Sequence, residues 1–129
     1  ELAGLPGGTA VVANQVLYNL SRRGIEHDLV PWCRARGVPI MAYSPVEQGR
    51  LLGNRALARV AARHQATPAQ LALAWLLAQP EVMVIPKAGT PDHVRENRAA
   101  VGLRLDAADH AELDKAFPSP RGPSPLAML

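Results

Sequence analysis

Three short apolar runs, separated by helical patterns, constrain the fold of this chain more than any other feature. The runs lie at 9–16, 38–45 and 81–87. Short runs that are apolar almost throughout predict strands buried on both faces, as in parallel sheets. The amphipathic segments between them predict covering helices. The expected class is therefore α/β, with the element order β-α-β-α-α-β-α-α.

Five helices are expected, at 27–37, 54–65, 67–79, from Thr90 to about Val101, and from Asp106 to Ala116. The helix at 67–79 has the clearest start. Thr67 can cap it, Pro68 suits its first turn, and Gln70 can complete a capping box. Thr90, followed by proline, repeats this signal, and Asp106 is the expected cap of the last helix.

The predicted sheet is too small to be complete. Three parallel strands would leave two unpaired edges, which soluble proteins avoid. The chain also begins with Glu1 rather than Met. We therefore expect the 129 residues to form part of a larger α/β domain. Residues 118–129 are rich in proline and are expected to form a tail without helix or strand.

Composition argues against several classes of function. The net charge of +3 is spread over several segments and aromatic residues make up only 4%, so no nucleic-acid-binding surface is expected. No apolar run reaches 18 residues, so no membrane span is expected. The single cysteine, Cys33, suits a reducing compartment, and we expect a cytoplasmic protein. His27, His64 and His110 have no partners at metal-ligand spacing, so no metal site is predicted.

Several stretches together carry a family resemblance. They are NQVLYNLSRRGIE (14–26), AYSPVEQGRLL (42–52), TPAQLALAWLL (67–77), IPKAGTPDHVREN (85–97) and LDAADHAELDKAFP (105–118). Their order and spacing resemble the C-terminal half of the aldo-keto reductases, above all bacterial members that reduce small aldehydes such as methylglyoxal. The resemblance implies a (β/α)₈ TIM barrel, of which residues 1–117 would supply strands six to eight.

The resemblance also implies a cofactor site at the C-terminal ends of the strands, where such barrels place their sites. There we expect Asn14 and Gln15, Tyr43, and Lys87. Gln15 would hydrogen-bond the nicotinamide carboxamide, and Tyr43 would stack on the nicotinamide ring. The following loop would pass over the pyrophosphate with Ser44, Val46, Gln48 and Gly49. The plainer alternatives are a buried glutamine satisfied by neighbouring loops and a core tyrosine.

A second group of residues resembles the phosphate and adenine site of the family. Lys87, Ala88 and Gly89 precede a helix start, where free N–H groups favour an anion such as the 2′-phosphate of NADP. His93 replaces the arginine of many NADPH-selective members, so discrimination against NADH should be reduced. Further along this helix, the resemblance implies that Glu96 and Asn97 contact adenine. The alternatives are a solvated Lys87 and an ordinary helix-surface Glu96.

The four catalytic residues of the family, an Asp, a Tyr, a Lys and a His, match no position in this chain. We therefore expect the cofactor-binding portion of an NADPH-dependent reductase of small aldehydes and ketones, inactive alone. It would need the missing N-terminal half or self-associate. The alternative is a non-enzymatic nucleotide-binding or regulatory subunit, or a truncated gene remnant.

Overall fold

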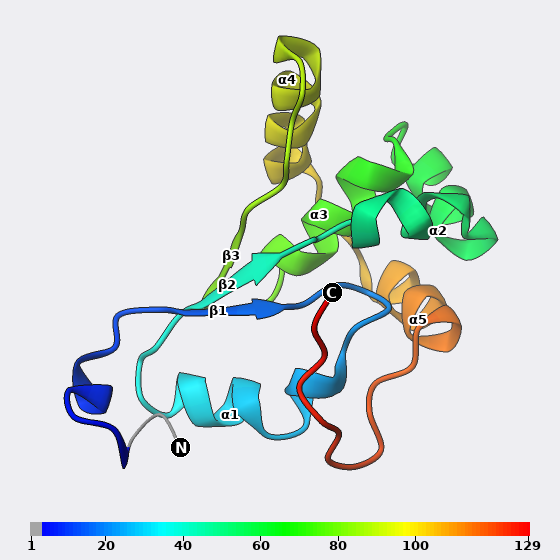
Figure 1. Cartoon of the computed structure of the whole chain (residues 1–129). Helices are drawn as coiled ribbons and strands as arrows, with labels where there is room; N and C mark the ends of the chain where they lie inside the picture. Colours follow the sequence, from blue (N-terminus) through cyan, green and yellow to red (C-terminus); the bar gives the residue numbers. More distant parts are fainter. Residues whose placement is uncertain (1–3) are drawn as a thin grey trace.

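The computed structural model describes residues 4–129, and its helices and strands follow the predicted order (Figure 1). The strands are β1 (Asn14–Leu17), β2 (Ile40–Tyr43) and β3 (Val82–Val84). The α-helices are α1 (Leu29–Arg34), α2 (Arg55–Arg63), α3 (Pro68–Leu77), α4 (Pro91–Ala99) and α5 (Ala107–Ala116). Short 3₁₀ helices are η2 (Gly8–Ala10), η3 (Gly24–Glu26), η4 (Glu47–Gly53) and η5 (Ala100–Gly102).

The three strands form one parallel sheet in the order β1-β2-β3. In the register, Val16 pairs with Ala42, and Ala42 pairs with Val84. Side chains of paired residues in a sheet point to the same side. One face of the sheet therefore carries Val16, Ala42 and Val84, and the other carries the residues between them.

The helices bury only the first of these faces. Val16 and Ala42 belong to the hydrophobic core together with side chains from α1, α2, α3 and α5. Helix α3 contributes most, because six consecutive residues from Leu71 to Leu76 are buried. Trp75 is 1% exposed and meets the ring of Tyr18 edge-on at 5.7 Å. The core thus lies between the sheet and its helices.

The opposite face of the sheet is largely uncovered, and we call it the open face. It carries Gln15, Leu17, Met41, Tyr43 and Met83. Met83 is 49% exposed, whereas Leu17, at the end of β1, is 1% exposed. The whole chain exposes 7810 Å² of surface, whereas a compact monomer of 13.8 kDa exposes about 6,600 Å². The expectation of strands buried on both faces is therefore wrong for this face, which has no second layer within residues 4–129.

All three strands are shorter than predicted. The apolar run at 9–16 forms η2 and an extended approach before β1 begins at Asn14, and Val12 is 85% exposed. The neighbouring strand begins only at Ile40, so the residues before Asn14 have no ladder partner. A strand needs a neighbouring strand to satisfy its backbone hydrogen bonds, and an apolar run does not show where that neighbour begins.

The helix starts agree closely with the sequence predictions. Thr67 and Gln70 form the expected capping box, and Asp106 caps α5 through a box with Asp109. Thr90 accepts a hydrogen bond from the backbone of His93, which caps α4. These signals are confirmed because each cap satisfies backbone N–H groups only two or three residues away.

The proline-rich tail is free of helix and strand, as expected. Arg23 holds its beginning in place through the carbonyl oxygen of Phe117 (2.6 Å) and the hydroxyl of Ser119 (2.6 Å). The same guanidinium pairs with Glu26 and lies 5.0 Å from the ring centre of Trp75. One arginine thus connects the tail to the core.

Candidate functional site

Two of the predicted cofactor residues, Gln15 and Tyr43, lie on the open face in neighbouring strands. Tyr43 is the last residue of β2, as expected, and is half-buried. Gln15 is the second residue of β1, so its predicted place at the C-terminal end of the strand is wrong. It pairs with Met41, two residues before Tyr43, which corresponds to about 7 Å along the strand. Both side chains can therefore reach one ligand on the open face.

Asn14 does not belong to this group. It begins β1 and points to the helix-covered face, where its Nδ2 lies 3.6 Å from the sulfur of Cys33. Cys33 is 1% exposed and packs in the hydrophobic core as a small apolar residue.

The loop after Tyr43 has an unusual backbone. Ser44 (φ 48°), Glu47 (φ 50°) and Gln48 (φ 55°) all lie in the left-handed region, and Gly49 follows at φ 87°. For residues with a side chain this conformation costs roughly 1 kcal/mol or more each. Gly49 alone adopts it without strain. Something must therefore hold residues 44–49, which we call the kinked loop, in this shape.

Glu47 stabilises this conformation of the kinked loop. Its side chain is 4% exposed, and its carboxylate accepts hydrogen bonds from Arg22 (Nε, 2.9 Å) and Asn19 (Nδ2, 2.7 Å). Asn19 is fully buried and also donates to the carbonyl oxygen of Ser44 (2.9 Å). Arg50 approaches the same carboxylate at 3.3 Å. The loops that follow β1 and β2 are thus joined through one buried carboxylate.

The charge state of Glu47 follows from this arrangement. Burial alone would raise its pKa, but hydrogen bonds from Arg22, Asn19 and Arg50 outweigh burial and hold the pKa below its usual range. The sequence reasoning missed Glu47, Asn19 and Arg22 altogether. The available signal was an acidic residue between Val46 and Gly49 in an otherwise short and uncharged loop.

The predicted phosphate segment follows β3. Lys87 is exposed and lies three residues beyond Val84, the last residue of β3, so it is on the C-terminal side of the sheet as expected. Ala88 and Gly89 lead from it to the start of α4, where they border an open hollow of about 530 Å³. Asp92 is in the first turn of α4 and pairs with Arg95 at 2.6 Å.

Helix α4 carries the remaining candidates and stands away from the sheet (Figure 1). His93 is exposed, and Asn97 is half-buried. Glu96 is engaged within the chain, because it accepts a hydrogen bond from the hydroxyl of Thr67 at 2.7 Å. Its carboxylate therefore joins α4 to the start of α3 at the protein surface.

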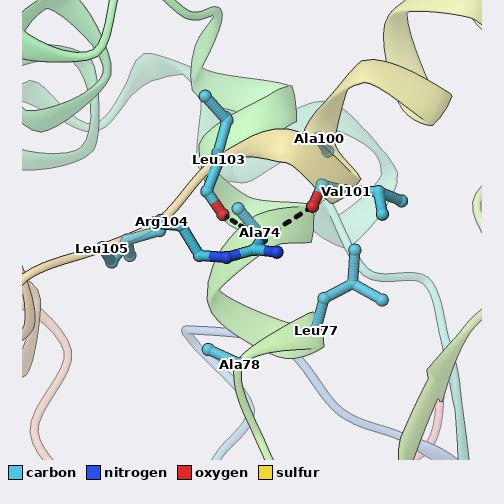
Figure 2. Close-up of a pocket in the computed structure, with 8 residues that line it drawn as sticks. All are labelled: Ala74, Leu77, Ala78, Ala100, Val101, Leu103, Arg104 and Leu105. Atoms are coloured by element: carbon cyan, nitrogen blue, oxygen red, sulfur yellow. Dashed lines mark hydrogen bonds between the residues drawn. The ribbon is translucent and has the colours of Figure 1, made fainter.

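A further hollow, of about 370 Å³, lies between the end of α3 and η5 (Figure 2). Its walls are mostly apolar, from Ala74, Leu77 and Val101, and Arg104 crosses it to donate to two carbonyl groups. None of the predicted cofactor residues lines it. The hollow is therefore separate from the open face and from the kinked loop.

Two features are absent from residues 4–129. No three side chains of His, Cys, Asp or Glu gather closely enough in this range to hold a metal ion. None of the helices described there has the length and apolar character that a membrane crossing requires.

Comparisons with known proteins agree with this geometry. The profile of the "Aldo/keto reductase family" matches residues 3–117. Methylglyoxal reductase YeaE of Escherichia coli is 47% identical, over 100% of this chain and 47% of its own length. The NADH-specific methylglyoxal reductase of the same species is 33% identical, over 74% of this chain and 38% of its own.

A solved structure gives the same result. The aldo-keto reductase of Klebsiella pneumoniae in complex with NADPH has a TM-score of 0.95 and 40% identity, covering 99% of this chain and 47% of that one. The chain thus spans about half the length of these relatives. Its three parallel strands and covering helices correspond to part of a (β/α)₈ barrel. The chain therefore belongs to the aldo/keto reductase family.

Proposed function

We propose that this chain is the cofactor-binding portion of an NADPH-dependent reductase that converts small aldehydes or ketones to alcohols. The observation that carries the proposal is that Gln15 and Tyr43 lie on the same open face of the sheet. The similarity of the fold to an aldo-keto reductase that was solved in complex with NADPH supports it. Methylglyoxal reductase YeaE supports a small carbonyl substrate. Cys33, buried and reduced, supports a cytoplasmic location.

Each candidate has a distinct task in this proposal. The bound cofactor would supply a hydride to the carbonyl carbon. Tyr43 would stack against one side of the nicotinamide, leaving the other side free for substrate. Gln15 would fix the ring's rotation through its carboxamide, because an amide offers both a donor and an acceptor. Ser44, Val46, Gln48 and Gly49 would border the pyrophosphate.

The far end of the cofactor would lie along the segment from Lys87 to α4. Lys87 would pair with the 2′-phosphate, with Ala88 and Gly89 allowing a close approach of the backbone. His93 would lie against adenine, and Glu96 and Asn97 would contact its amino group. Glu96 has one carboxylate oxygen free for this purpose, since only Oε1 accepts the Thr67 hydroxyl. NADH would serve as a second cofactor, because His93 stands where many NADPH-selective members have an arginine that can form two hydrogen bonds with the phosphate.

Proton transfer to the substrate oxygen is not assigned to this chain. Tyr18, which might be considered, is 1% exposed and donates to Glu26 at 2.8 Å. Burial and the neighbouring carboxylate raise its pKa far above the usual range, so it is a poor proton donor. The acid chemistry that the family resemblance implies must come from residues outside these 129.

Replacing Lys87 with methionine tests the phosphate assignment. The dissociation constants of NADPH and NADH are measured by fluorescence titration on the protein as its gene encodes it. The substitution should weaken NADPH roughly ten- to a hundredfold, as expected for a lost charged hydrogen bond, and leave NADH nearly unchanged. Lys115→Met, on the exposed surface of α5, is the matched control. Equal losses for both cofactors would refute the assignment.

Catalysis needs its own measurement, because a nucleotide-binding subunit without activity would bind NADPH equally well. Oxidation of NADPH is followed by absorbance with methylglyoxal as substrate. NADPH binding without turnover would support the binding subunit over the reductase.

A further inference from the structure

The kinked loop contains a charged side chain that points into the protein. Residues 44–49 follow the C-terminal end of β2, and in this segment Gln48 is exposed and Gly49 is half-buried. Glu47, between Val46 and Gln48, instead turns inward and is 3% exposed. A buried carboxylate is costly unless it is fully paired, so its presence in a short loop requires a reason.

The pairing of Glu47 is complete on both oxygens. Oε1 accepts from Nε of Arg22 at 2.9 Å and from Arg50 at 3.3 Å, and it lies 2.8 Å from Nη2 of Arg22 in an ion pair. Oε2 accepts from Asn19 at 2.7 Å. Charged hydrogen bonds of this kind are stronger than neutral ones. Glu47 is therefore a firm connection rather than an incidental contact.

Asn19 passes this connection to the backbone of the loop. Its Nδ2 donates both to Glu47 and to the carbonyl oxygen of Ser44. Its Oδ1 accepts from the backbone and the hydroxyl of Ser21. The carbonyl of Ser44 also accepts the backbone N–H of Glu47 at 3.0 Å. Two of the strained residues, Ser44 and Glu47, are thus fixed by the same buried amide and carboxylate.

We propose that Glu47 is a positioning residue, which acts through Asn19 and Arg22 to hold the kinked loop in the shape that presents Gln48 and Gly49 to the cofactor. This inference rests on the proposed function, because it concerns affinity for the same dinucleotide. Without the carboxylate, the left-handed residues relax toward ordinary backbone conformations. The binding-competent shape is then only one of several, and the apparent affinity falls in proportion to its population.

The test compares Glu47→Gln with Glu112→Gln. Glu112 is a good control because its carboxylate also lies between two arginines, Arg59 and Arg63, but it joins α2 to α5 and takes no part in the hydrogen bonds that hold the kinked loop. Three quantities are measured on the protein as its gene encodes it: the NADPH dissociation constant, the urea midpoint, and hydrogen exchange of the amides of residues 44–53.

Glu47→Gln should raise the NADPH dissociation constant roughly tenfold and accelerate amide hydrogen exchange in residues 44–53. Glu112→Gln should lower the urea midpoint without either effect. Adding Arg22→Gln to Glu47→Gln should weaken NADPH little further, because both act through one contact. If Glu47 only stabilises the fold, the two single variants should have the same NADPH dissociation constant once their urea midpoints are taken into account. That result would overturn the inference.

The exchange measurement separates this inference from the proposed function. If the unaltered protein binds no NADPH, the proposed function fails and the cofactor role of Glu47 fails with it. Faster exchange in Glu47→Gln would still establish that the carboxylate holds the loop. Unchanged exchange would overturn that part as well.

Discussion

Replacing Asp109 with asparagine should lower the free energy of unfolding by about 2 kcal/mol at neutral pH and by much less in acid. The carboxylate of Asp109 is 2% exposed in α5. It accepts from Arg63 at 2.7 Å and from the backbone of Asp106 at 3.0 Å, and it lies 2.6 Å from Nε2 of His64. It therefore connects the end of α2 to the start of α5.

The magnitude follows from the pKa of this carboxyl group. Burial would raise the pKa, but the hydrogen bonds from Arg63, Asp106 and His64 lower it from 3.8 to about 2. Because the folded-state pKa is depressed, the contribution is present above about pH 4 and is lost as the pH falls toward 2. A shift of this size corresponds to about 2 kcal/mol at pH 7, and less than half of that contribution remains at pH 2.5.

The assay is urea unfolding of both proteins between pH 7 and pH 2.5, followed by circular dichroism. The gap between the two stability curves should narrow steadily below about pH 4. Glu112→Gln removes the other carboxylate that contacts Arg63 and should have the smaller effect, because it lies at the surface. A gap that stays constant down to pH 2.5 would refute the argument that the charge of Asp109 causes the stabilisation.

Three further outcomes follow from the packing. Thr67→Ala removes the cap of α3 and the contact with Glu96, and should cost about 1 kcal/mol in urea unfolding, whereas Thr67→Ser should cost much less. Leu76 is 0% exposed, so Leu76→Ala leaves a cavity and should lower the free energy of unfolding by roughly 2–5 kcal/mol. The neighbouring Leu77 is 40% exposed, and Leu77→Ala should change it only slightly. The 129-residue chain, produced alone, should self-associate through the open face and the edges of β1 and β3, so its mass in analytical ultracentrifugation should rise with concentration; a monomer at every concentration would contradict this picture.

The sequence predicted best what is decided locally. Thr67, Thr90 and Asp106 satisfy donors within their own first turns, so a few letters were enough to locate three helix starts. The order of the elements followed from the hydrophobic patterns. The assignment to an α/β fold did as well, because alternation of strands and helices leaves few other arrangements.

Features that depend on distant parts of the chain were predicted poorly. The position of Gln15 within β1 depends on where Ile40 begins the neighbouring strand. The burial of Glu47 depends on Asn19, 28 residues earlier, and no local pattern indicates that pair. The roles of Lys87 and His93 rest on resemblance, because the geometry gives them only exposure and proximity to the start of α4. The role of Asn97, which is half-buried near the end of α4, also rests on resemblance.

Helix α4 has a consequence for how tightly any nucleotide can be held. None of its side chains is buried, although it carries His93, Glu96 and Asn97. Segments with so few buried contacts open locally at a small free-energy cost. A nucleotide that needs the helix formed must also stop it from unfolding, and its observed dissociation constant rises as the folded fraction of the helix falls. Any contact that stabilises the folded form of α4 therefore increases nucleotide affinity, even when the contacting residue does not touch the nucleotide.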